Sequence, residues 1–247
     1  MSIAHNKLTT IKNIHMKKFY LIISIFILGM VLASCKKNDV SSPTSKITVT
    51  TPFTVSDIDG NVYDTIKIGT QVWLQENLQT THYRDGSAIP VVADNTEWSK
   101  LTTGAYCYYN NDSANRAIYG KLYNWYAAIS PSGIAPVGWH IPSDSEWNVL
   151  INYLGGEYAA GGTMKSMSLW NTPNLGASNN SGFTAVPAGA RYSVDGTFYD
   201  LGNYGGFWST ENSSYGRTRL LSNESAGVYL DSYTDQACGL SIRCIKD

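Results

Sequence analysis

The sequence has few charged residues and few side chains that bind metals. Only 15% of its 247 residues are charged, and it has four histidines and four cysteines. Four lysines and no acidic residue precede Cys35, so the remainder carries a net charge of about −5. A mildly acidic domain without a basic stripe argues against a nucleic-acid partner. Only His82 and His140 follow Cys35, and the cysteine spacings match no zinc site, so we predict no cofactor.

Common catalytic signatures are also absent. No serine lies in a nucleophile elbow, no glycine-rich loop is suited to a phosphate group, and no segment repeats with a fixed period. By contrast, 43% of the residues are hydrophobic, with 17 tyrosines and seven tryptophans among them. This composition is sufficient for a packed core and is typical of loop-rich extracytoplasmic proteins.

No apolar run reaches the roughly 20 residues that a membrane-spanning helix needs. The longest, from Phe19 to Val31, follows the charged Met16-Lys17-Lys18 and precedes Leu32-Ala33-Ser34-Cys35. This arrangement predicts a lipoprotein signal peptide over residues 1–35, in which Met16 is the true start and Cys35 is acylated after cleavage.

Acylation would anchor the mature chain to a membrane, because each buried methylene group contributes about 0.8 kcal/mol. Residues 36–52 are polar and contain Ser, Thr and Pro, so we predict a flexible tether there. Residues 53–247 then form one folded domain, held through lipid on Cys35 to the cell envelope, with the outer membrane favoured. Whether it faces the periplasm or the exterior stays open.

Three cysteines remain beyond Cys35, in a compartment that permits disulfides. Cys238 and Cys244 lie six residues apart in a segment that reads as extended, which at about 3.3 Å per residue places them near 20 Å apart. We therefore predict a disulfide between Cys107 and Cys244, with Cys238 left over.

The domain begins with a pattern typical of a β-hairpin. Alternating residues predict strands over 55–58, 62–68 and 71–74, with a turn at Asp59-Gly60. A calcium-binding loop is the alternative, since acidic and amide residues alternate from Asp57. The spacing disfavours it, because Gly60 falls at loop position 4 and Ile68 occupies the position of the final glutamate.

Two helices and a series of short strands follow. Apolar spacing predicts one helix over residues 119–128, and Ser143 and Glu146 form a capping box for a second, which ends at Gly155-Gly156. Strand-like runs come next, separated by Gly, Asn, Ser and Asp, at residues 183–186, 197–199, 206–209, 218–221, 227–230 and 239–245. The fold class expected is α+β.

Several segments resemble a known family. DIDGNVYDTIKIGTQVWLQENL, GAYCYYNND, YGKLYNWYAA, GWHIPSDSEW, SGFTAVPAGARY, FWSTE and SIRCIKD resemble, in this order, the Fibrobacter succinogenes major paralogous domain. That family is similar to the C-type-lectin-like group that includes formylglycine-generating enzymes. The resemblance implies a C-type-lectin-like fold with two helices, a twisted antiparallel sheet that joins the two ends of the domain, and long loops that carry function.

An envelope enzyme is one function to weigh. Cys238 and Cys244 superficially resemble the copper-binding pair of formylglycine-generating enzymes, but their surroundings do not match. A carboxylate-dependent hydrolase would need two loop carboxylates about 5 to 9 Å apart, which a sequence does not reveal. Glu146 is explained by helix capping and His140 by a structural hydrogen bond. We therefore favour a protein that is not an enzyme.

A calcium site is a further possibility, with less support from the sequence. Residues 197–208 loosely resemble the stretch that holds calcium in formylglycine-generating enzymes, with Asp200 and Asn203 as candidate ligands.

Loop aromatics with Asn and Ser favour recognition of a glycan or protein ligand, because rings stack at low entropic cost and amides adapt their hydrogen bonds. The candidate ligand-binding residues are Trp170, Asn171, Asn180, Arg191, Tyr192, Tyr204, Glu211, Tyr215 and Arg217.

Overall fold

The computed structural model describes residues 53–211 and 214–247. The predicted signal peptide (1–35), the lipidation site Cys35 and the predicted tether (36–52) lie outside the described residues. In the described ranges, no helix is long and apolar enough to span a bilayer.

The predicted N-terminal strands are confirmed. Strands β1 (Thr54–Ser56), β2 (Val62–Ile68) and β3 (Gln71–Leu74) pair antiparallel in chain order. In β2, Tyr63 packs in one core cluster and Ile66 and Ile68 pack in another, so both faces of the strand contribute to the core.

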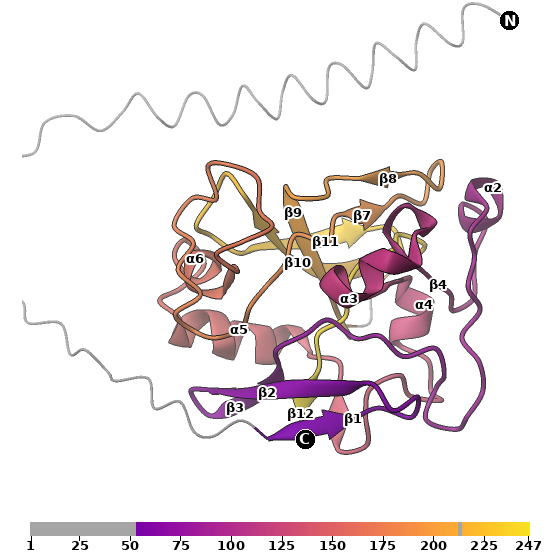
Figure 1. Ribbon diagram of the computed structural model, residues 1–247, viewed down its shortest axis with the longest axis horizontal. Helices are drawn as coiled ribbons and strands as arrows, with labels where there is room; N and C mark the ends of the chain where they lie inside the picture. The colour runs from indigo at the N-terminus through magenta and orange to yellow at the C-terminus, as the bar shows by residue number, and fades with distance from the viewer. Residues whose placement is uncertain (1–52, 212–213) are drawn as a thin grey trace, which may run out of the picture. The chain divides into compact units, whose positions relative to one another are not determined.

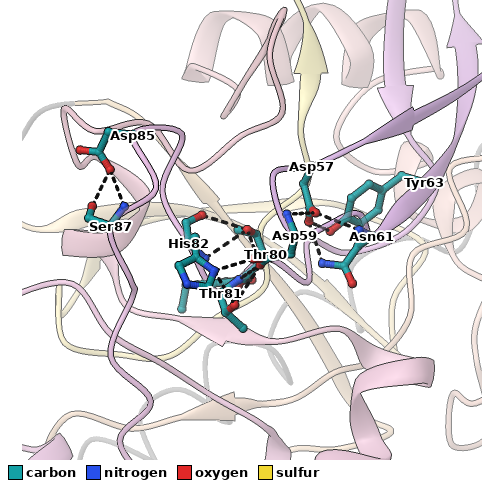
Figure 2. Close-up of polar contacts among 10 residues, drawn as sticks. Asp57, Asp59, Asn61, Tyr63, Thr80, Thr81, His82, Asp85 and Ser87 are labelled. Atoms are coloured by element: carbon teal, nitrogen blue, oxygen red, sulfur yellow. Dashed lines mark hydrogen bonds and ion pairs between the residues drawn. The ribbon is translucent and has the colours of Figure 1, made fainter.

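The turn between β1 and β2 lies at Asp59-Gly60, as predicted, and Asp57 stabilises it from within the hairpin. Asp57 Oδ1 accepts hydrogen bonds from the backbone N–H groups of Asp59 and Asn61, both at 3.0 Å, and its Oδ2 accepts from the hydroxyl of Tyr63 at 2.6 Å. Figure 2 shows this carboxylate enclosed by its own hairpin. Its oxygens are thus engaged by protein donors, which supports a turn over a calcium loop.

Asp59 links this turn to the segment after β3. Its carboxylate accepts hydrogen bonds from Thr80, from Thr81 and from the ring of His82 (Figure 2). Partial burial acts to raise the pKa of Asp59, but these hydrogen bonds outweigh it and lower the pKa to about 2. The sequence pattern did not indicate this network.

A strand from the other end of the domain completes the first sheet. Strand β12 (Ile245–Lys246) lies between β3 and β6 (Trp139–His140), and the order of strands is β1-β2-β3-β12-β6. Figure 1 shows the C-terminal strand β12, in yellow, beside the N-terminal strands, in indigo. The antiparallel sheet therefore joins the two ends of the domain, as expected.

The second predicted helix is present and the first is not. Helix α5 (Asp144–Tyr153) has the predicted capping box of Ser143 and Glu146. Residues 119–128 instead form the end of α3 (Arg116–Tyr119), strand β5 (Leu122–Tyr123) and helix α4 (Trp125–Ala128). The prediction was wrong because Gly120, with φ of +74°, ends α3, and β5 then pairs with β4 (Tyr106–Cys107).

The described residues contain five short α-helical segments rather than two helices, and only α5 is longer than five residues. The others not yet named are α2 (Asn95–Trp98) and α6 (Ala160–Met164), with 3-10 turns η1 (Tyr109–Asn111) and η2 (Ser113–Asn115).

The later strands form two further antiparallel sheets. Strands β9 (Tyr204–Ser209), β10 (Gly216–Ser222) and β11 (Tyr229–Thr234) pair in the order β11-β10-β9, and β7 (Ala190–Arg191) pairs with β8 (Phe198–Tyr199). Most predicted strands are recovered, at least in part. The predicted strand at 183–186 reduces to a single bridge of Ala185 with Lys165, and the one at 239–245 reduces to isolated bridges at 239–241 before β12 begins at Ile245. The fold is mixed, with few helices and antiparallel sheets, compatible with the α+β class.

Aromatic side chains pack α5 against both larger sheets. Trp147 of α5 lies 4.8 Å from Trp73 of β3 and 5.9 Å from Phe207 of β9, measured between ring centroids. Phe183 completes the cluster at 5.7 Å from Trp73. This core connects α5 with β3 and β9.

Candidate functional site

Part of the predicted ligand-binding set gathers around the β7–β8 hairpin. The rings of Tyr192 and Tyr199 stack with centroids 4.6 Å apart and an interplanar angle of 35°. They and Tyr204 remain about 40% exposed: 41%, 41% and 39%. The charge of Asp200 and the phenol of Tyr204 both act on Tyr192, so all four lie close together. We call Tyr192, Tyr199, Asp200 and Tyr204 the tyrosine ledge.

Hairpin geometry explains why the two rings meet. Side chains alternate between the faces of a strand, so Arg191 and Phe198, which are paired, point inward, and Tyr192 and Tyr199 share the outer face. The tip of the hairpin is fixed by Asp195, whose Oδ1 accepts hydrogen bonds from the backbone N–H and the hydroxyl of Thr197, at 3.0 and 2.6 Å.

Carboxylates hold both stacked rings in place. Tyr192 donates its hydroxyl proton to Asp200 Oδ2 at 3.2 Å, and Tyr199 donates to Asp195 Oδ2 at 3.1 Å. Burial raises the pKa of Tyr192, and the charge of Asp200 and this hydrogen bond raise it further. The phenol therefore stays protonated, and the ledge has a rigid aromatic surface with an acidic edge.

Asn171 lies beside the ledge. Its backbone N–H donates to Gly202 O at 2.8 Å, and its side-chain amide donates to Asn203 Oδ1 at 2.9 Å. Asp200 and Asn203, the candidate calcium ligands, are on one turn, where Asn203 N donates to Asp200 O at 2.9 Å. Their side chains turn to different partners, Tyr192 and Asn171. In the parts of the chain that the structure describes, no group of three or more His, Cys, Asp or Glu is arranged to hold a metal ion.

A second part of the predicted set lies near the start of α5. Arg217 Nη1 is 2.6 Å from Asp144 Oδ2, and the charge of Glu211 acts on the same guanidinium. The ring of Tyr215 meets that of Tyr233 edge-on at 6.0 Å. Asn180 is exposed in the loop before Phe183 and joins neither group.

Trp170 and Arg191 are buried, contrary to the prediction that they contact a ligand. Trp170 is 8% exposed, and its Nε1 donates to Ala185 O at 2.9 Å. Arg191 is fully buried and donates to several acceptors, including Val92 O at 2.6 Å, while its guanidinium stacks 4.4 Å from the ring of Trp98. Both side chains support the ledge and its surroundings from inside.

The predicted disulfide is not formed. Cys107, Cys238 and Cys244 are free thiols. Cys107 packs with the core cluster around Trp98, and Cys244 packs with a different cluster around Tyr63, so their contacts with the core keep them apart. Burial raises the pKa of both thiols to about 12, so both stay protonated at neutral pH.

His140 and Glu146 have the structural roles that the sequence indicated. Glu146 Oε2 accepts from the backbone N–H of Ser143 at 2.8 Å, and its Oε1 lies 2.8 Å from His140 Nε2. The other ring nitrogen, Nδ1, lies 2.6 Å from Asp247 Oδ1, a partner that the sequence did not indicate.

Comparison with family models identifies the Fibrobacter succinogenes major domain, which matches residues 66–246. The search of curated proteins and the search of solved structures each gave no match. The matched range covers more than half of the chain and runs from β2 to β12. The chain therefore belongs to the Fibrobacter succinogenes major domain family.

Proposed function

We propose that this protein is a binding protein of the cell envelope and that its tyrosine ledge binds a glycan. The observation that carries the proposal is the stacked pair of Tyr192 and Tyr199, half exposed and fixed through hydrogen bonds to Asp200 and Asp195. Rings that are already fixed lose little entropy when a sugar stacks on them. The carboxylates and the neighbouring Asn171 supply acceptors for sugar hydroxyl groups.

The proposal extends to the fold family and the anchor. Closure of the sheet by β12 and the loops around β7, β8 and β9 support a C-type-lectin-like fold, in which loops carry the binding surface. The sequence before Cys35 supports lipidation of that residue. Replacement of Cys35 by Ala should abolish incorporation of labelled fatty acid and release the protein from the membrane fraction, and retained label would contradict the anchor.

The envelope-enzyme alternative has no observation in its favour among the described residues. Asp200 belongs to the ledge, Glu211 lies near Arg217, and the carboxylate of Asp231 accepts hydrogen bonds from Tyr233 and Thr234 on its own strand. Cys238 and Cys244 have raised pKa values, because burial disfavours their thiolates.

The test is glycan binding by the full chain in a detergent that contains no sugar. We expect the wild type to bind at least one oligosaccharide on an array, and Tyr192→Ala with Tyr199→Ala to weaken binding by at least about tenfold, which corresponds to about 1.4 kcal/mol. The matched control is Tyr158→Ala, since Tyr158 is 88% exposed and far along the chain from the hairpin. Absence of glycan binding by the wild type, or equal loss in the control, would overturn the proposal.

A further inference from the structure

A cleft with a volume of about 210 Å³ is lined by residues that do not belong to the tyrosine ledge. Four separate segments line it: residues 75–79 after β3, residues 117–120 at the end of α3, residues 184–186, and Arg243. At about 30 Å³ per water molecule, the cleft has room for roughly seven waters, so it suits a molecule smaller than a typical drug. Each of the four segments overlaps or adjoins one of the sequence segments that resemble the family.

Arg243 forms a rigid floor for this cleft. It is fully buried and donates to Asn77 Oδ1 at 2.9 Å, to Leu74 O at 3.0 Å and to backbone carbonyls of the 183–184 segment. These bonds and the one from its Nε occupy all five N–H donors of the guanidinium. Arg243 therefore fixes the segments that line the cleft but has no donor left for a ligand.

Other residues that line the cleft have side-chain polar atoms without a hydrogen-bond partner in the described ranges. In the described ranges, no hydrogen bond involves Glu76 Oε1 or the side-chain amide of Gln79, although Glu76 Oε2 accepts from Asp64 N at 2.9 Å. Gln75 Nε2 donates to Gly182 O at 2.8 Å, which leaves its Oε1 available. Acceptors thus outnumber donors, and Ile118 and Val186 add apolar surface.

We propose that this cleft binds a small polyhydroxylated molecule, of the size of a monosaccharide or a cyclic polyol. Its hydroxyl groups donate to Glu76 and Gln75 and accept from the amide of Gln79, while its C–H face packs on Ile118 and Val186. The cleft is too small for a chain of sugars, and none of its lining residues belongs to the tyrosine ledge, so this proposal does not rest on glycan binding at the ledge.

Glu76 is the residue that selects a ligand with donor groups. Burial raises its pKa, and the charge of Arg243 opposes that effect. Glu76→Gln replaces a lone-pair acceptor by an amide, while keeping the side chain's size. Ala117→Trp tests the site sterically, because Ala117 lines the cleft and is itself exposed. Its matched control is Ala114→Trp, which is also exposed but does not line the cleft.

The experiment is saturation-transfer NMR and calorimetric titration of the full chain with glucose, galactose, mannose and myo-inositol, in the same sugar-free detergent. We expect at least one probe to bind, and Glu76→Gln and Ala117→Trp each to weaken binding by about tenfold or more. Ala114→Trp and the double variant at Tyr192 and Tyr199 should bind as the wild type does. Unchanged thermal unfolding would show that each variant is folded.

Two outcomes would overturn the proposal. One is failure of all four probes to bind the wild type at millimolar concentration. The other is binding that survives both Glu76→Gln and Ala117→Trp, or that disappears in the Tyr192 and Tyr199 double variant, which would place the sugar at the ledge instead.

Discussion

His140 shows how a single side chain ties distant parts of the domain together. One ring nitrogen contacts Glu146 of α5 at 2.8 Å and the other contacts Asp247, beyond β12, at 2.6 Å. Partial burial acts to lower the pKa of His140, but the hydrogen bonds to Asp247 and Glu146 outweigh it and raise the pKa. Because both nitrogens face carboxylates, the protonated ring is the form that fits.

This arrangement predicts a pH-dependent contribution of His140 to stability. The folded-state pKa lies above the ordinary value of 6.5, so the contribution is fully present below about pH 6.5 and is lost as the pH rises through the folded-state pKa. Thermal unfolding of the wild type and of His140→Gln should therefore differ most near pH 6 and converge at alkaline pH. A difference between the two proteins that stays constant across this range would contradict the prediction.

Whether a single side chain is buried or exposed was the hardest feature to predict from the sequence. Tyr192, Tyr204 and Asn171 do lie together on the surface, but Trp170 and Arg191 are buried. Arg191 is buried because its acceptors include Val92 O, 99 residues earlier in the chain, and a local pattern has no information on such a contact. The stacking partner Tyr199 was missed, although the Asp195-Gly196 pair between Tyr192 and Tyr199 is a hairpin signal in the sequence.

At the scale of elements, local signals were reliable only where they were complete. Helix α5 was predicted because its capping box is complete within four residues. The side chain of Ser143 bonds the backbone N–H of Glu146, and the side chain of Glu146 bonds the backbone N–H of Ser143. Residues 119–128 have helical spacing but contain Gly120, and Asn124 accepts from the backbone N–H of Ala127 to begin a new helix. The spacing of apolar residues was outweighed there by pairing between β4 and β5, which depends on a segment elsewhere in the chain.

The capping box of α5 should contribute measurably to the stability of the domain. Ser143→Ala removes the side-chain acceptor for the N–H of Glu146 and the hydroxyl that contacts Glu146 Oε2 at 2.8 Å. We expect the free energy of unfolding to fall by about 1 kcal/mol, measured by denaturant titration. Ser143→Thr retains the hydroxyl and serves as the control, with an expected loss well below that of Ser143→Ala. Equal losses in the two variants would show that the cap is not the cause.

At the scale of the whole molecule, packing rather than covalent links holds the domain together. The structure has three free thiols, and Cys107 and Cys244 are buried in different core clusters. Hydrophobic burial of the tryptophan and tyrosine side chains supplies the main driving force, as in other domains of this size.

Reducing agents should therefore leave the stability of the domain unchanged. We expect the same unfolding temperature with and without dithiothreitol, because the three cysteines of the described residues form no disulfide that could be reduced. In denaturant without reductant, alkylation followed by mass spectrometry of tryptic peptides should find Cys107, Cys238 and Cys244 all modified. Protection of any two of them until reductant is added would contradict the free-thiol structure.

The position of β12 between β3 and β6 determines when the domain is able to fold. Ile245 pairs with both Trp73 and His140, so the first sheet stays divided until nearly the whole domain has been synthesised. During that time Trp73 and its aromatic neighbours are not covered by Ile245. An incomplete chain therefore exposes hydrophobic surface and is prone to aggregate. A nascent chain stalled just short of residue 245 should consequently depend on chaperones more than the finished chain does.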